Sequence, residues 1–116
     1  MRYFFKSFVY AVNGIWSGVT EQLNLKVQIG VALLVIGAGF YYHISPIEWY
    51  VILLCIGLVL GLEMMNSAIE DLVDLVTLER KPLAGRIKDI AAGAVLLVSV
   101  ISVVIGVLVF RKYVVS

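Results

Sequence analysis

Three long apolar stretches constrain this 116-residue chain more than any other feature, and they predict spans over about residues 25–44, 48–75 and 89–110. An α-helix needs about 20 residues, at about 1.5 Å per residue, to cross the roughly 30 Å core of a bilayer. Hydrophobic residues make up 62% of the chain, and a soluble fold this short could not bury so many. The sequence therefore predicts an all-α integral membrane protein with three transmembrane helices, forming one domain over residues 1–116.

The segment before the first span, about residues 2–22, is amphipathic. Its apolar residues recur at helical spacing: Tyr3, Phe4, Phe8, Val12, Ile15, Trp16 and Val19. Polar residues occupy much of the remainder, as in a helix that lies on a membrane surface. The alternative is a frayed terminus. We expect an N-terminal surface helix that belongs to the mature protein, because no small-residue cleavage pattern follows a long apolar stretch.

Basic residues predict the orientation of the chain. The connection between the first two spans contains no Lys or Arg. The second connection, about residues 76–86, contains Arg80, Lys81 and Arg86, and Lys88 lies two residues beyond it. The positive-inside rule then places the N-terminus and the second connection in the cytoplasm. Arg111 and Lys112 in the tail oppose this more weakly, by two charges against four. The net charge of +1 gives no reason to expect nucleic-acid binding.

An acidic stripe at the end of the second apolar stretch is the main candidate for function. At about 100° per residue, Glu63, Asn66, Ser67, Glu70 and Asp74 fall on one helix face. An ionised side chain facing lipid costs at least about 2.5–3.5 kcal/mol at the helix centre, so Glu63 must face other helices, a polar crevice or a cation. The alternative is that the later acids lie in the interface and only Glu63 needs a packing partner.

Charges of the second connection lie on the same side of the membrane as this stripe. Carboxylates that hold Mg²⁺ beside cations that hold phosphate suggest phosphoryl transfer. Such cations are also common as topology markers or contacts to lipid headgroups. No phosphate-binding loop of the GxxxxGK[ST] type occurs in the chain, so a soluble nucleotide-binding fold is excluded.

Two motifs resemble the prokaryotic diacylglycerol kinase family, which includes the undecaprenol kinases. LGLEMMNSAIEDLVD, residues 60–74, is similar to the family pattern E-x-x-N-[ST]-A-I-E-x-x-[VI]-D, and GRIKDIAAGAV, residues 85–95, is similar to its KD-x-x-A-G-A-V. The resemblance covers nearly the whole chain, including the surface helix and the three spans. It implies a homotrimeric kinase of the bacterial inner membrane, with shared active sites, that uses MgATP to phosphorylate a lipid hydroxyl.

The resemblance also implies roles for individual residues. Glu63 corresponds to the catalytic base and Glu70 to a metal ligand that also belongs to the ATP site, with Asn66 and Ser67 beside them as positioning residues. The other residues expected to bind ATP are Tyr10, Glu79, Arg80, Lys81, Lys88 and Asp89. His43-Ile44-Ser45 and Glu48-Trp49 are more similar to the undecaprenol kinase branch, so undecaprenol is expected in preference to diacylglycerol.

One departure from the family pattern concerns the metal. The family normally has a glutamate just before the first span, where this chain has Gln22. An amide oxygen can bind Mg²⁺ but brings no charge, and Glu21 next to it is a possible substitute. The alternatives to an undecaprenol kinase are therefore a diacylglycerol kinase and a catalytically weakened or non-enzymatic membrane protein, such as an ion-binding component.

Overall fold

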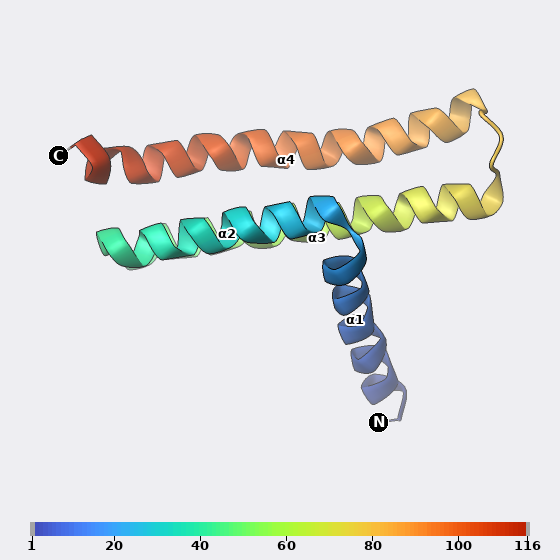
Figure 1. Cartoon of the computed structure of the whole chain (residues 1–116), viewed down its shortest axis with the longest axis horizontal. Helices are drawn as coiled ribbons and strands as arrows, with labels where there is room; N and C mark the ends of the chain where they lie inside the picture. Colours follow the sequence, from blue (N-terminus) through green and yellow to red (C-terminus); the bar gives the residue numbers. More distant parts are fainter. Residues whose placement is uncertain (1, 116) are drawn as a thin grey trace.

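The computed structural model describes residues 2–115 and contains four α-helices: α1 (Arg2–Glu21), α2 (Leu23–Tyr42), α3 (Pro46–Val76) and α4 (Pro82–Val115). The described residues form no strand, so the predicted all-α fold is confirmed. α2, α3 and α4 run side by side with alternating direction, whereas α1 leaves them steeply at the start of α2 (Figure 1). Each of α2, α3 and α4 is long and apolar enough to cross a membrane.

Few side chains are buried inside this bundle. The buried apolar residues are Leu25, Ala32, Ile44, Ile52, Val73 and Val95. Most large apolar side chains of the three long helices face outward, and a soluble monomer rarely exposes an apolar surface of that extent. A bilayer solvates such a surface, so the protein is a membrane protein.

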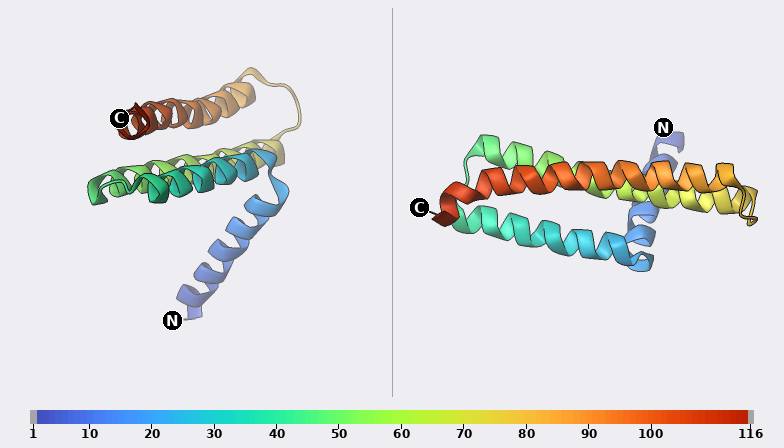
Figure 2. Two further views of the ribbon diagram at one scale, coloured as in Figure 1. Left: turned by 60° about the vertical axis from the view of Figure 1, so that its left-hand side comes forward. Right: turned by 90° about the horizontal axis from the view of Figure 1, so that it is seen from above.

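α1 has no buried residue and lies across the direction of the three long helices, as Figure 2 shows. When those helices cross a bilayer, α1 lies along its surface. Its exposed aromatic side chains, such as Phe8 and Trp16, suit the headgroup region. The N-terminal helix predicted over about residues 2–22 is therefore present, with α2 starting one residue after Gln22.

The connection between α2 and α3 is closed by local hydrogen bonds. His43 ends α2 in the left-handed conformation, with φ 54°. Ser45 and Glu48 form a capping box, in which the Ser45 hydroxyl accepts from the Glu48 amide at 3.3 Å and the Glu48 carboxylate accepts from the Ser45 amide at 2.9 Å. Pro46 occupies the first helical position, where a missing N–H is tolerated.

The connection between α3 and α4 is shorter than the sequence suggested. It covers residues 77–81, because α4 begins at Pro82, and Gly85 lies inside the helix with its amide bonded to the Lys81 carbonyl at 3.1 Å. Pro82 and Gly85 both fall inside the connection that the sequence predicts over about residues 76–86. A proline at the first helical position needs no hydrogen-bond partner, so it starts this helix rather than interrupting it.

α3 and α4 are much longer than a bilayer requires. Their 31 and 34 residues correspond to about 46 and 51 Å, against a hydrocarbon core of roughly 30 Å. Both helices extend past the junction of α1 and α2, on the side of residues 77–81 (Figure 1). We call this junction, residues 21–23, the elbow. The end of α3 and the start of α4 therefore project beyond the level of the surface helix.

The opposite end of the bundle is held by one carboxylate. Glu48 at the start of α3 forms an ion pair with Lys112 near the end of α4, at 2.9 Å, and accepts a hydrogen bond from the Tyr113 hydroxyl. The Lys112 ammonium also lies 5.1 Å from the centre of the Tyr113 ring. These contacts fix the end of α4 against the start of α3.

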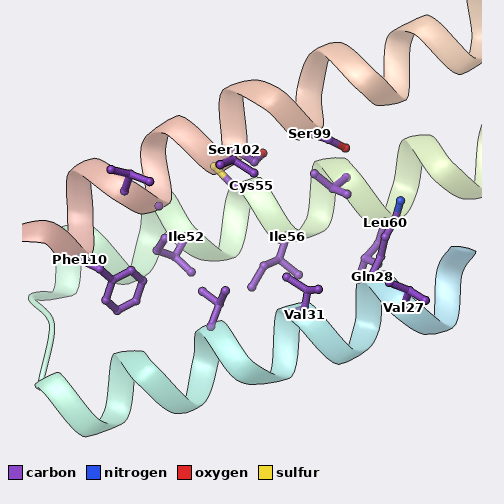
Figure 3. A pocket seen from close by; sticks show the side chains of 16 residues that line it. Val27, Gln28, Val31, Ile52, Cys55, Ile56, Leu60, Ser99, Ser102 and Phe110 are labelled. Carbon is purple, nitrogen blue, oxygen red and sulfur yellow. The ribbon is translucent and has the colours of Figure 1, made fainter. Parts of the chain in front are cut away.

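An apolar groove lies between α2, α3 and α4 (Figure 3). Its volume is about 530 Å³. It extends from Gln28 and Leu60 at one end to Phe110 at the other, and Val31 and Ile56 line its middle. Leu60 is three residues before Glu63, so the groove begins next to the acidic stripe.

Candidate functional site

The acidic stripe passes from a buried environment into water along α3. Glu63 is only 5% exposed and Asn66 8% exposed, whereas Glu70 is half-buried and Asp74 is exposed. The elbow, where α1 meets α2, contacts α3 at Ser67, which lies between Glu63 and Glu70. The two buried residues of the stripe, Glu63 and Asn66, are therefore those nearest to the membrane, where an uncompensated polar group is most costly.

Asn66 has an unsatisfied acceptor in this stripe. Its Nδ2 donates to Oε1 of Glu70 at 3.4 Å, but its Oδ1 is buried without a hydrogen-bond partner. Leaving a buried acceptor unpaired costs about 1–3 kcal/mol. The side chains of Asn66 and Glu70 therefore offer a buried amide oxygen and a carboxylate, close together and open to a cation or a donor.

The elbow contacts the stripe through Gln22. The hydroxyl of Ser67 forms a close hydrogen bond with the side chain of Gln22, across 45 residues of sequence, and also approaches the Glu63 carbonyl at 3.1 Å. Glu21, by contrast, accepts from the Ser17 hydroxyl at 3.0 Å within α1. The structure thus brings Gln22, rather than Glu21, to the acidic stripe.

The basic residues of the second connection surround a hollow at the end of α3. Its volume is about 490 Å³, and it is lined by the end of α3, the connection and the first turns of α4. The charged lining residues are Asp74, Glu79, Arg80, Lys81 and Lys88. The Lys88 ammonium pairs with Asp74 at 2.7 Å, whereas Lys81 and Glu79 are 3.8 Å apart and mostly exposed. The N-terminus of α4 adds its partial positive charge beside these cations, so the hollow suits an anion such as a phosphate.

Two residues expected at the ATP site are not brought into this hollow by a single chain. Tyr10 is 68% exposed and lies on α1, which points away from the bundle (Figure 1). Asp89 follows Lys88 on α4 and is exposed. The remaining expected residues form two neighbouring groups, one around Glu63 to Glu70 and one around Lys88.

Sequence reasoning missed two contacts near these groups and one at the opposite end of the bundle. It did not pair Lys88 with Asp74, it did not join Ser67 to Gln22, and it gave no role to the Glu48 contacts at the far end. The capping-box pattern Ser45-x-x-Glu48 signals the start of α3, but not the contacts of Glu48 with Lys112 and Tyr113. All three contacts join distant segments, whose register no single helix pattern reveals.

Comparison with known proteins decides the family. The model of the family described as "Prokaryotic diacylglycerol kinase" matches residues 9–110. The chain belongs to the prokaryotic diacylglycerol kinase family. It is 47% identical over 107 residues to the undecaprenol kinase of Bacillus subtilis, covering 92% of this chain and 87% of that protein. It is also 38% identical to a diacylglycerol kinase of Synechocystis, covering 86% of this chain and 58% of that protein.

Membership confirms the expected class of enzyme. The family and these relatives are lipid kinases, and a diacylglycerol kinase of Haemophilus influenzae is a further relative, 30% identical over 74% of this chain and 73% of that protein. The family implies ATP-dependent phosphoryl transfer to a membrane lipid. The three apolar helices agree with a substrate that lies in the bilayer.

Proposed function

We propose that this protein phosphorylates the hydroxyl of undecaprenol, in preference to diacylglycerol, with ATP as the phosphate donor. The observation that carries the proposal is the burial of Glu63 and Asn66 at the membrane end of the acidic stripe. A carboxylate at this level can meet the hydroxyl of a lipid whose chain stays in the bilayer. The 47% identity to the undecaprenol kinase of Bacillus subtilis supports the choice of lipid.

The apolar groove also supports a long-chain substrate. It begins at Leu60, one turn before Glu63, and leads along the bundle toward Phe110 (Figure 3). Its volume of about 530 Å³ is typical of ligand sites, about 300–1,000 Å³. We assign it to the hydrocarbon chain of the lipid, with the hydroxyl group at Glu63.

Glu63 acts as the general base in this proposal. Its carboxylate takes the proton of the lipid hydroxyl while that oxygen forms a bond to the γ-phosphorus of ATP, and the bond to the β,γ-bridging oxygen breaks to release ADP. Lys88, with Glu79, Arg80 and Lys81 around it, holds the nucleotide at the hollow. Asn66 and Ser67, which lie between Glu63 and Glu70 on α3, position these two carboxylates.

The residues of the stripe fit a nucleotide-bound Mg²⁺. The described residues include no cluster of three or more Asp, Glu, His or Cys side chains that could hold a metal by themselves. A Mg²⁺ ion on ATP needs only one or two protein carboxylates besides phosphate oxygens and water. Glu70 would supply one, and the unpaired Oδ1 of Asn66 would supply a neutral oxygen beside it. When bound, the ion neutralises charge on the phosphates.

We further propose a homotrimer with shared sites in the bacterial inner membrane, and a single domain over residues 1–116. The N-terminus and residues 77–81 face the cytoplasm, where ATP is found, in agreement with the basic residues of that connection. The exposure of Tyr10 on α1 supports sharing, because the α1 of a neighbouring chain can then bring Tyr10 to the ATP site. Mixed trimers of Tyr10→Ala and Glu63→Gln chains test this. Shared sites predict recovered activity on mixing, because one site can then combine an intact Glu63 with the intact Tyr10 of a neighbouring chain, and separate sites predict none.

A panel of lipids with MgATP tests the function itself. Purified full-length protein in micelles should phosphorylate undecaprenol with a higher kcat/KM than diacylglycerol. A preference for diacylglycerol would make the protein a diacylglycerol kinase. No transfer to any lipid would favour the weakened or non-enzymatic alternative that Gln22 raised, and Gln22→Glu would then be expected to restore transfer if a missing carboxylate is the cause.

A further inference from the structure

Gln22 occupies the elbow with its backbone fully engaged. Its amide donates to the Gly18 carbonyl at 3.1 Å, and its carbonyl accepts from the Lys26 amide at 3.1 Å. It stands before the first residue of α2 with extended backbone angles, and its side chain makes no capping bond there. The side chain is therefore available for a contact with another helix.

That contact is the hydrogen bond with Ser67. Of the side-chain hydrogen bonds among residues 2–115, this one alone joins the elbow to α3. Ser67 lies about 6 Å along the helix axis from Glu63 and about 4.5 Å from Glu70, at about 1.5 Å per residue. The elbow is thus fixed to α3 between the two carboxylates that the proposed function uses.

An amide suits this position better than a carboxylate. The Ser67 hydroxyl has one proton and two neighbouring oxygens, the side chain of Gln22 and the Glu63 carbonyl. An amide presents an oxygen or an NH₂ group to its neighbour. In the structure the Ser67 hydroxyl donates to Oε1 of Gln22, with the Glu63 carbonyl as its second neighbouring acceptor. A carboxylate could accept the same hydrogen bond, but it would add a third negative charge beside Glu63 and Glu70.

We propose that Gln22 is a positioning residue that acts through Ser67, and that it holds the surface helix at the level of Glu63. This inference rests on the proposed function and deepens it: the contact fixes where the membrane surface meets the base, and hence the depth at which a lipid hydroxyl is presented. Gln22 is engaged with Ser67 and does not serve as the second metal ligand.

Kinetics of single and double variants test the role. Gln22→Ala and Ser67→Ala should each lower kcat by about fivefold, the effect of one hydrogen bond. The double variant should lose about fivefold rather than about 25-fold, because both changes remove the same contact. Ser67→Thr, which keeps the hydroxyl, should restore activity. The Mg²⁺ concentration for half-maximal rate should stay unchanged in all of them and in Gln22→Glu. Thr20→Val is the control, since this hydroxyl bonds only within α1.

Multiplicative losses, or a lower Mg²⁺ requirement in Gln22→Glu, would overturn the proposal in favour of a metal role. A readout without activity separates it from the proposed function. In a Cys55→Ser background, a short bifunctional thiol reagent should crosslink Q22C/S67C within one chain, and should not crosslink S7C/S67C, because Ser7 lies near the far end of α1. If Q22C/S67C crosslinks only between chains, or not at all, the contact between Gln22 and Ser67 within one chain is overturned, whereas the proposed kinase function is unaffected. If the wild type transfers no phosphate, the proposed function fails and the positioning role with it, although the contact stands on the crosslink.

Discussion

The ion pair between Lys88 and Asp74 allows a sharp test of the hollow as a phosphate site. Its atoms are 2.7 Å apart, and the two side chains are 38% and 48% exposed. An ion pair as exposed as this contributes about 0.2–1 kcal/mol. If Lys88 only held Asp74, removal of either charge would have the same small effect.

The proposed function predicts different effects of substituting Lys88 and Asp74 on kcat/KM for ATP. A charge-assisted hydrogen bond from Lys88 to a phosphate contributes about 1.5–3 kcal/mol, so Lys88→Met should lower kcat/KM for ATP by about 10- to 150-fold. Asp74→Asn removes only the partner of the free enzyme and should change kcat/KM by no more than about fivefold.

The assay measures transfer of labelled phosphate from ATP to undecaprenol in micelles, over a range of ATP concentrations at saturating Mg²⁺. Thermal unfolding of both variants is measured in parallel, so that a loss of fold is not counted as a loss of binding. Equal effects of the two substitutions on kcat/KM would refute the assignment of Lys88 to the nucleotide and leave it as the structural partner of Asp74.

Three further predictions concern the bundle. Glu48→Gln removes the ion pair with Lys112 and should lower the unfolding temperature while leaving kcat nearly unchanged, because it lies at the end away from the acidic stripe. Gly39→Val should destabilise the bundle by about 1–3 kcal/mol, since a Cβ at Gly39 would lie 2.6 Å from the Trp49 ring; chemical denaturation measures this. Ile56→Trp should fill the apolar groove and raise KM for undecaprenol more than for a short-chain isoprenoid alcohol.

Each of these has an outcome that contradicts it. An unchanged unfolding temperature in Glu48→Gln would mean that the contacts with α4 do not hold the bundle. An unchanged stability in Gly39→Val would mean that the two helices do not approach closely at the turn. Leu54→Trp, on an outward-facing position, is the control for the groove, and equal KM values in Leu54→Trp and Ile56→Trp would remove the groove from the substrate site.

The sequence predicted the helices well because their causes are local. The three apolar stretches and the amphipathic period of residues 2–22 each act within one segment. The boundary of α4 was predicted less well. Pro82 and Gly85 are typical of loops, but a proline at the first position of a helix is also favourable, and only packing of α4 on α3 decides between these.

The sequence predicted part of the candidate site. The contacts that it did not predict also have a physical cause. The helical period placed Glu63, Asn66, Ser67 and Glu70 on one face of α3, and the structure has that face buried at its membrane end. The contacts of Ser67 with Gln22 and of Lys88 with Asp74 depend on how far one helix slides along another. The helical period of a sequence carries no information on that displacement, so these two contacts could not be predicted from the sequence.

The central claim is that Glu63 is the base of a lipid kinase, and Glu63→Gln tests it most directly. This variant keeps the size of the side chain and removes its ability to accept the hydroxyl proton, and general-base catalysis contributes about 10²–10⁴-fold. With undecaprenol and MgATP, we predict that kcat falls by at least about 100-fold while the unfolding temperature is maintained. A folded variant that transfers phosphate within a few-fold of the wild-type rate would contradict the account.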